Sequence, residues 1–418
     1  MKRFNLKLIT LILTAVFLVS GGITTMLVFA QVVPDFTAGT PGGDKWVEYN
    51  ESWSLDLDAG GTLIVDLSSV DVSVEIGTSD KIVANFEGYA TPDSKGNFPK
   101  ILASGSASRQ KLAESEYNQR NFQLSLGPTY SSGYGLSGTM TVQLPRNKDV
   151  RLEVGLFSGN AEIKGGQYTH LAVNTSSGRI TVKDIKSSAS AEFTSFSGNI
   201  DAVDIQAKDC KFDTSSGHVS ASNIVVDTLS SKHFSGKLNG KDITVSGGFT
   251  VNTSSGNVDL TAFTSNSLSI EGFSSDARLT DGKVSQKVLI DTSSGKVVFD
   301  GLTADFLDLK TFSGNITGER VTAQRLRSDT SSGDLDMAML QAADLDCKTF
   351  SGKVDFIMPG DYAFSVDVDT FSGDVDIGYP ITMKNTGSES KITGVVGSGG
   401  NTVRIESSSG NVSIYPAS

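Results

Sequence analysis

The sequence predicts an all-β protein, a single-stranded parallel β-solenoid (β-helix) of about twelve coils, each 19–20 residues long. Two observations carry this prediction. A short phrase, Thr-Ser-Ser-Gly or Thr-Phe-Ser-Gly, returns at nearly constant spacing, and apolar residues recur at fixed distances from its glycine. A period near 20 residues that slips by one residue at a time is typical of a solenoid, in which each repeat forms one coil. The phrase glycines, expected to form a structural turn, are Gly159, Gly178, Gly198, Gly217, Gly236, Gly256, Gly295, Gly314, Gly333, Gly352 and Gly373.

The apolar residues define inward columns. They lie seven and five residues before the glycine, and two and seven residues after it. Around Gly217, for example, they are Cys210, Phe212, Val219 and Ile224. Each coil therefore sends apolar side chains inward from three places, as expected for short strands with three apolar faces.

The phrase has a rhythm of its own. Its second residue alternates between phenylalanine and serine from Phe157 to Phe350, and the rhythm breaks at Phe371. This alternation predicts a structural unit of two coils, with a ring on every second corner. We expect the glycine to adopt a positive φ and the serine before it to bond a neighbouring backbone group. Ser275 takes the place of the glycine in one coil.

Charged residues also form columns. Four residues before the glycine, the later coils carry Asp291, Lys310, Asp329, Lys348 and Asp369. Strands stacked in register place such side chains next to one another, where opposite charges attract and like charges repel. The alternating signs therefore favour stacking in register.

The first 30 residues predict a targeting segment. Two lysines and an arginine precede an uncharged, largely apolar run, residues 8–30. A signal peptidase would cut after Ala30, whereas an uncleaved run of this length could anchor the chain in a membrane. Both alternatives predict an exported chain, at the cell surface or extracellular, with the basic flank left in the cytoplasm.

The remaining chain divides by pattern into a Gly/Pro-rich linker (31–44), an N-terminal β region and cap (45–150), the solenoid repeats (151–378) and C-terminal coils with a cap (379–418). Residues 91–120 break the strand pattern as a polar excursion, whose second half is compatible with a short helix. One last phrase ends at Gly410, after the period fails. We expect this tail to close the stack, because an open end presents unpaired backbone groups.

Composition excludes some partners. The formal charge is −12, and it becomes −15 without the three cations of residues 1–30. Such an acidic chain is a poor ligand for nucleic acid, whose affinity comes from phosphate neutralisation, or for anionic lipid. Cys210 and Cys347 lie seven repeats apart, roughly 34 Å in a stack with strands about 4.8 Å apart. We therefore expect buried free thiols and no disulfide.

A family resemblance rests on three features together: the N-terminal membrane segment, the stretch VQLPRNKDVRLEV (142–154) and the serial TSSG coils. The chain resembles the bacterial putative adhesin family over roughly residues 50–415. The resemblance implies an exported β-solenoid domain in the cell envelope and, for some relatives, an association with envelope-stress regulation. It brings no catalytic residue and no cofactor.

The histidines do not suggest an active site. His170, His218 and His233 fall on different coils and in different columns. They form neither a metal-ligand spacing nor a catalytic triad pattern. We expect surface or corner histidines, no catalytic residue and no cofactor.

One acidic face has alternative interpretations. Five aspartates occupy the first and third places after the glycine on three coils that we expect to be neighbours, with Lys353 among them: Asp334, Asp336, Asp355, Asp374 and Asp376. Clustered carboxylates can bind Ca²⁺, or cleave a glycosidic bond with one acid and one base or nucleophile. The simpler interpretation is a solvated face that keeps the protein soluble.

The sequence therefore favours a non-enzymatic, exported surface or envelope protein. It would be a rigid, adhesin-like or structural scaffold whose partners are envelope polymers or surface proteins, with membrane contact through residues 8–30 if these are uncleaved. Two alternatives stay open. One is an extracytoplasmic sensor or accessory module of envelope-stress regulation. The other is a polysaccharide-active β-helix enzyme.

Overall fold

A computed structural model of the chain describes residues 46–55, 61–91, 101–105, 121–126, 135–146, 148–385 and 390–417. These residues form strands and turns. The expected targeting segment and linker (1–44), and the second half of the polar excursion (106–120), lie outside the described residues. Within the described ranges, no helix is long and apolar enough to cross a membrane.

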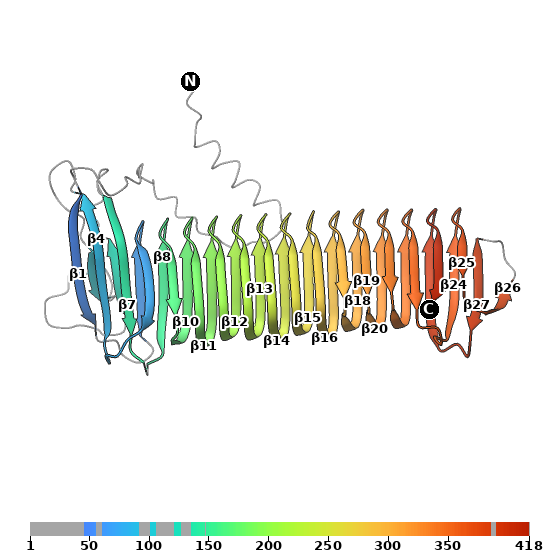
Figure 1. Cartoon of the computed structure of the whole chain (residues 1–418), viewed down its shortest axis with the longest axis horizontal. Coiled ribbons are helices and arrows are strands. Elements are labelled where there is room, and N and C mark those ends of the chain that lie inside the picture. Colours follow the sequence, from blue (N-terminus) through green and yellow to red (C-terminus); the bar gives the residue numbers. More distant parts are fainter. Residues whose placement is uncertain are drawn as a thin grey trace, which may run out of the picture. The chain divides into compact units, whose positions relative to one another are not determined.

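The strands form a parallel β-solenoid of about 11 turns, which confirms the predicted fold class (Figure 1). Neighbouring coils pair in register, so that Ile200 lies opposite both Ile180 and Val219. The strands of the regular coils are β10 (Gln167–Thr175), β11 (Ile180–Ser195), β12 (Ile200–Thr214), β13 (Val219–His233), β14 (Leu238–Thr253), β15 (Val258–Gly272), β16 (Ala277–Thr292), β17 (Val297–Asp300), β18 (Thr303–Thr311), β19 (Ile316–Glu319), β20 (Thr322–Thr330), β21 (Leu335–Ala338), β22 (Gln341–Thr349) and β23 (Val354–Met358).

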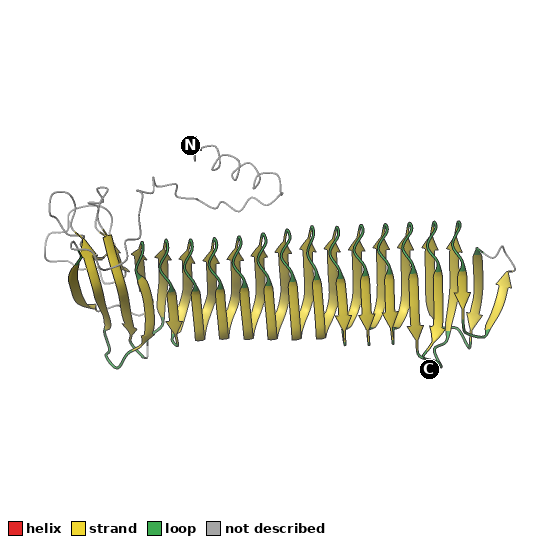
Figure 2. Cartoon of the chain, turned by 45° about the horizontal axis from the view of Figure 1, so that its top comes forward, coloured by secondary structure: helices red, strands yellow, loops and turns green. Residues whose placement is uncertain are grey.

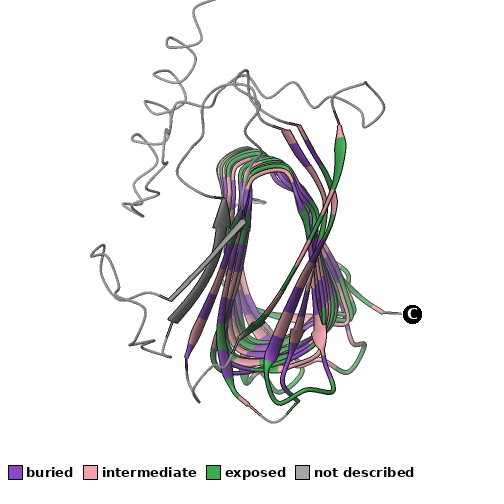
Figure 3. Cartoon of the chain, turned by 90° about the vertical axis from the view of Figure 1, so that its left-hand side faces the viewer, coloured by how far each residue is buried: buried purple, intermediate pink, exposed green. Residues whose placement is uncertain are grey.

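The predicted apolar columns form the core. Seen end on, the coils superimpose as one narrow ring (Figure 3). The residues seven and five before the glycine, and two and seven after it, are buried in the regular coils, including Cys210, Phe212, Val219 and Ile224. A further buried column, four residues after the glycine, contains Val182 and Leu260. Alternate residues of each strand thus face a continuous interior.

Both cysteines belong to these columns. Cys210 and Cys347 are buried free thiols, as predicted. Burial in an apolar interior raises the pKa of each thiol, because the thiolate would lose its hydration.

The TSSG phrase forms the first corner of each coil, and these corners follow one another in a straight row (Figure 2). The hydroxyl of the threonine accepts a hydrogen bond from the glycine N–H, as between Thr214 and Gly217 at 2.9 Å. The threonine is buried, whereas the next two side chains face solvent. The serine before the glycine donates to a carbonyl of the preceding coil in several coils, for example Ser197 to Ser176 at 3.3 Å.

The expected positive φ at the phrase glycines is wrong. None of these glycines has a positive φ in the described coils. They are required because consecutive corners are in close contact. A Cβ on Gly217 would lie under 3.0 Å from the carbonyl oxygen of Gly198, closer than real Cβ atoms come. In the exceptional coil, the Ser275 hydroxyl occupies the space where a side chain at Gly272 would lie.

The positive φ angles occur at the second corner, six residues after the glycine. There the backbone is left-handed in successive coils, at Gly165, Asp184, Asp204, Asn223, Asp242, Ala262, Asp281, Gly301, Arg320 and Met339. Glycine, asparagine and aspartate tolerate this conformation best, which explains their frequency in the column. Ala262, Arg320 and Met339 adopt it against their preference.

The N-terminal end is not built in sequence order. Its strands are β1 (Val47–Leu55), β2 (Thr62–Leu67), β3 (Asp71–Ile76), β4 (Ile82–Thr91), β5 (Ile101–Gly105), β6 (Asn121–Leu126), β7 (Gly135–Leu144), β8 (Val150–Leu156) and β9 (Ala161–Lys164). The coil β2–β3 pairs with β6–β7 on one side and with β8–β9 on the other. Antiparallel strands complete this end, since β4 pairs with β7 and β1 with β4.

The C-terminal end uses the same device. Its strands are β24 (Phe364–Thr370), β25 (Val375–Ile377), β26 (Ile381–Asn385), β27 (Lys391–Val396), β28 (Asn401–Ser407) and β29 (Val412–Pro416). The last coil, β28–β29, lies between β22–β23 and β24–β25, and β27 pairs antiparallel with β24 (Figure 1). The expectation that the tail closes the stack is therefore wrong, because the tail fills a position one coil inside the end.

Candidate functional site

The inserted C-terminal coil divides the predicted acidic face. Asp336 lies beside Asp355 on the next coil. Ser413 of β29 then separates Asp355 from Asp376. The five aspartates therefore do not lie on three neighbouring coils, because the spatial order of the coils differs from the sequence order. No group of three or more His, Cys, Asp or Glu residues is placed to hold a metal ion in the described part of the chain.

The individual aspartates have structural partners. The Asp355 carboxylate pairs with Lys353 and raises the pKa of that ammonium group. The Tyr415 hydroxyl donates to Asp376, which raises the pKa of Tyr415. Each of these two carboxylates therefore has a neighbouring side chain as a partner.

Asp334 belongs to a column that caps the backbone. One residue after the glycine, the side chain accepts the N–H of the same position on the next coil. Asn315 accepts from Asp334 at 3.1 Å, and Asp334 accepts from Lys353 at 2.9 Å. Asn411 accepts from Asp374 at 3.0 Å in the same way. Asp334 is therefore part of the stacking of coils.

Each of the three histidines occupies a different column of the solenoid. His218 lies in this capping column and accepts the N–H of Lys237 at 3.0 Å. His170 is half-buried and bonds Ser190. His233 takes the place of the phrase threonine, where it is buried, and desolvation lowers its pKa to about 4. The three rings stay on separate coils, as predicted.

The most regular exposed feature is a row of aromatic rings that we call the phenylalanine ladder. It follows the first corner, and its rings are 44% to 89% exposed in the described coils. Its members are Phe157, Phe196, Phe234, Phe273, Phe312, Phe350 and Phe371. A serine corner separates each ring from the next.

The ladder becomes unbroken when the coils are read in spatial order. Ser68 of the β2–β3 coil lies next to Phe157, and accepts its N–H at 2.9 Å. Ser408 of the inserted coil lies between Phe350 and Phe371, because the N–H of Ser409 bonds Phe350 and that of Ser372 bonds Ser408. The break at Phe371 in the sequence is thus filled in the structure.

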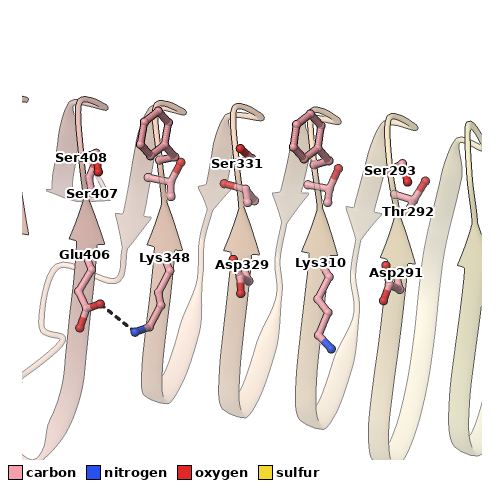
Figure 4. A pocket seen from close by; sticks show the side chains of 15 residues that line it. Asp291, Thr292, Ser293, Lys310, Asp329, Ser331, Lys348, Glu406, Ser407 and Ser408 are labelled. Atoms are coloured by element: carbon pink, nitrogen blue, oxygen red, sulfur yellow. Dashed lines mark hydrogen bonds and ion pairs between the residues drawn. The ribbon is translucent and has the colours of Figure 1, made fainter.

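A shallow trough of about 620 Å³ runs along the foot of the ladder. It crosses five neighbouring corners, with Phe312 and Phe350 on its rim and serines between them. Its other side is a row of alternating charges on successive coils (Figure 4). That row contains Asp291, Lys310, Asp329, Lys348 and Glu406. Lys348 and Glu406 form an ion pair at 2.8 Å.

The inserted coil adds a member to each charge column. Four residues before the glycine, Glu406 lies between Lys348 and the like-charged Asp369, and Asp369 pairs with Lys391 at 2.6 Å. Two residues earlier in each strand, Arg404 lies between two aspartates, Asp346 and Asp367, which would otherwise be neighbours. The alternation of charge therefore continues through the C-terminal end in the column of Arg404 and breaks in the column of Glu406.

Comparison with known proteins agrees with this architecture. The family model described as Toastrack DUF4097 matches residues 62–288 and 247–415. The chain belongs to the Toastrack family. These matches span both of the out-of-order ends as well as the regular coils.

A solved structure described as a putative cell adhesion protein from Clostridium sporogenes is 11% identical in sequence. The match covers 89% of this Toastrack chain and 100% of that chain, with a TM-score of 0.16. A similarity of that size carries no structural argument. No curated protein matches the chain significantly.

Proposed function

We propose that this Toastrack chain is an exported, non-enzymatic scaffold of the cell surface, adhesin-like in its use of a long rigid solenoid. Its partners would be envelope polymers or surface proteins. Solenoids of stacked repeats suit this role because they offer extended surfaces on which one contact recurs many times. The outer faces of the strands stacked in register are such a surface in this chain.

One observation carries the proposal. The described coils run without interruption from β1 at one end of the stack to the C-terminal cap at the other (Figure 1). Residues 1–45 join the solenoid just before β1. A membrane anchor in residues 8–30 would therefore hold the solenoid by one end and leave its length available to partners.

Protease treatment of intact cells that produce the full chain tests this role. We expect the protein to be digested from outside without lysis, starting in the polar segments outside the regular coils. A chain that stays intact until the cells are broken would contradict export. The mature N-terminus decides between two forms: Gln31 as the first residue would weaken the anchored-sensor alternative, and Met1 would favour it.

The geometry does not favour the glycan-cleaving alternative. Asp336 and Asp355 remain neighbours, but Asp355 is engaged by Lys353 and Asp376 lies two coils away. We expect no turnover of envelope glycans by the full chain. Turnover that disappears in the variant carrying Asp336→Ala and Asp355→Ala would overturn the non-enzymatic proposal.

A further inference from the structure

We infer that the phenylalanine ladder is a pairing surface for a second copy of this chain. Two solenoids would lie side by side and antiparallel, with the rings of each above the serine corners of the other. The inference goes beyond the proposed function and does not depend on export. It follows from the exposed area, spacing, direction and charge of the ladder.

The exposed area is that of a stable interface. At about 200 Å² for each phenylalanine, the observed exposures leave roughly 850 Å² of ring surface uncovered in one chain. A typical protein–protein interface buries about 800 Å² on each partner. The ladder alone therefore supplies the area that a dimer needs.

The spacing fits interdigitation. Neighbouring rings are two coils apart, roughly 10 Å when strands are about 4.8 Å apart. A ring placed midway lies roughly 5 Å from each neighbour, within the range that aromatic pairs prefer. A second copy has the same spacing by construction, because the same hydrogen bonds set its coil rise. Any other partner would have to match that period along the whole row.

The two ends of the described row favour the antiparallel arrangement. Among the corners that the structure describes, the row runs in spatial order from a serine, Ser68, to a phenylalanine, Phe371. Full overlap of two antiparallel copies therefore places every phenylalanine opposite a serine. Full overlap of two parallel copies would place ring against ring. The antiparallel pair is two-fold symmetric, with its axis between the Ser254 and Phe273 corners, so it closes as a dimer.

The charge row agrees with this register on either side of the axis. Four residues before the glycine, the serine corners of Gly217 and Gly295 carry Asp213 and Asp291, and the phenylalanine corners of Gly236 and Gly314 carry Lys232 and Lys310. Full antiparallel overlap brings Asp213 opposite Lys310 and Lys232 opposite Asp291, twice each by symmetry. Such charge complementarity fixes register more than it adds affinity. Glu271 faces the neutral Asn252, and at the two ends of the row Asp66 faces the like-charged Asp369.

Cysteine cross-linking of the full chain tests both the pairing and its register. Ser254 lies beside the proposed axis, so Ser254→Cys brings two thiols to neighbouring positions, about 5 Å apart along the stack. Ser331→Cys, at an equally half-buried corner, leaves its two thiols roughly 34 Å apart. The native thiols Cys210 and Cys347 are buried. With a short, membrane-permeant bismaleimide, we expect a product of doubled mass from Ser254→Cys and none from Ser331→Cys.

Ladder variants test the surface itself. In the Ser254→Cys background, replacing Phe273, Phe312, Phe350 and Phe371 by serine should lower the cross-linked fraction at least about tenfold, because central aromatic contacts dominate interfaces. The matched control replaces exposed apolar residues outside the ladder, Val225, Met339 and Ile357, by serine and should leave it unchanged. A single Phe312→Lys variant serves if the multiple variant is poorly produced.

Several outcomes would overturn the inference. One is the absence of a doubled-mass product from Ser254→Cys, and another is equal cross-linking at Ser331→Cys. A ladder variant that still cross-links, or a product whose mass shows a different protein or a glycan, would assign the ladder to another partner.

Discussion

At the residue scale, the recurring residues of the first corner serve the contact between one coil and the next. The phrase glycine lets two corners approach closely, and the threonine hydroxyl accepts the glycine N–H. The residue after the glycine accepts a backbone N–H of the following coil. These roles follow from the accounting of buried backbone polar groups, each of which needs a partner.

The glycine requirement can be measured. Gly236→Ala would bring a Cβ under 3.0 Å from the carbonyl oxygen of Gly217, and backbone cannot move aside as a flexible side chain can. We expect a loss of about 3 kcal/mol in the free energy of unfolding, followed by urea denaturation. Gly248→Ala, whose nearest neighbour would be the Ser267 hydroxyl at 3.7 Å, should be close to neutral. Equal losses at both positions would contradict the close-approach argument.

At the positions with positive φ, a change to glycine should stabilise the protein. Ala262 has φ of 54°, so Ala262→Gly should stabilise the protein by about 1 kcal/mol by removing the cost of this conformation. Ala189 is exposed in β11 with an ordinary φ, and Ala189→Gly should destabilise by roughly 0.5–1 kcal/mol. Thermal midpoints of the two variants should therefore move apart. If both variants have lower thermal midpoints, the entropy of the unfolded chain outweighs the relief of the left-handed conformation at Ala262.

His233 should make the protein sensitive to acid. Its neighbours on adjacent coils are Thr214 and Thr253, so no carboxylate stabilises a protonated ring from the same column. The unfolded ring binds a proton below pH 6.5, whereas the folded ring does so only below about pH 4. Protonation thus favours unfolding, and stability falls by about 3 kcal/mol between these limits.

The His233→Thr variant carries the threonine found at most other corners, and it should not show this loss of stability between pH 6.5 and about pH 4. Unfolding free energies of wild type and variant should keep a constant difference above pH 7, and the variant should gain relative to wild type as the pH falls toward 4. A difference that stays constant over the whole range would rule out His233 as the source.

At the element scale, the two ends show how an open sheet edge is closed. Each end inserts the coil nearest the chain terminus between two coils that are closer to the middle of the sequence, and then adds antiparallel strands. An antiparallel neighbour changes the hydrogen-bonding pattern of the edge, so a further parallel coil no longer fits. This explains why the stack ends where it does.

The inserted coil should be the part that holds the C-terminal cap. Ending the chain after Gly400 removes β28–β29, the parallel neighbours of β24–β25. We expect limited proteolysis to cut residues 364–396 rapidly, while the coils up to β23 stay protected. A truncated chain in which β24 and β27 resist the protease as in the full chain would show that the cap stands alone.

At the scale of the whole molecule, the regular coils were predictable from the sequence because each column repeats a local requirement. The apolar columns, the buried cysteines and the in-register charges are all confirmed. We predicted the positive φ at the phrase glycine, whereas it occurs six residues later. Glycine is favoured both where two backbones approach closely and where the backbone is left-handed. The sequence pattern alone does not separate these two reasons.

The spatial order of the terminal coils was harder to predict, because pairing of consecutive coils is the simplest assumption. The sequence nevertheless contains an indication of the inserted coil. Between Phe350 and Phe371 the ring rhythm breaks, and between Asp346 and Asp367 the charge rhythm breaks. A coil carrying a serine and an arginine at these places would repair both, and the last phrase, with Ser408 and Arg404, carries both. The ladder as a surface also escaped prediction, because exposure at a corner depends on the direction of the side chain.

The inserted C-terminal coil makes completion of this end of the solenoid depend on residues that are synthesised after both of its neighbouring coils. The position between β22–β23 and β24–β25 stays vacant until residues 401–416 have been synthesised and released. A prematurely terminated product therefore keeps a gap in its sheet and an unsecured cap, both open to degradation. This end of the solenoid is therefore closed only in a chain that includes residues 401–416.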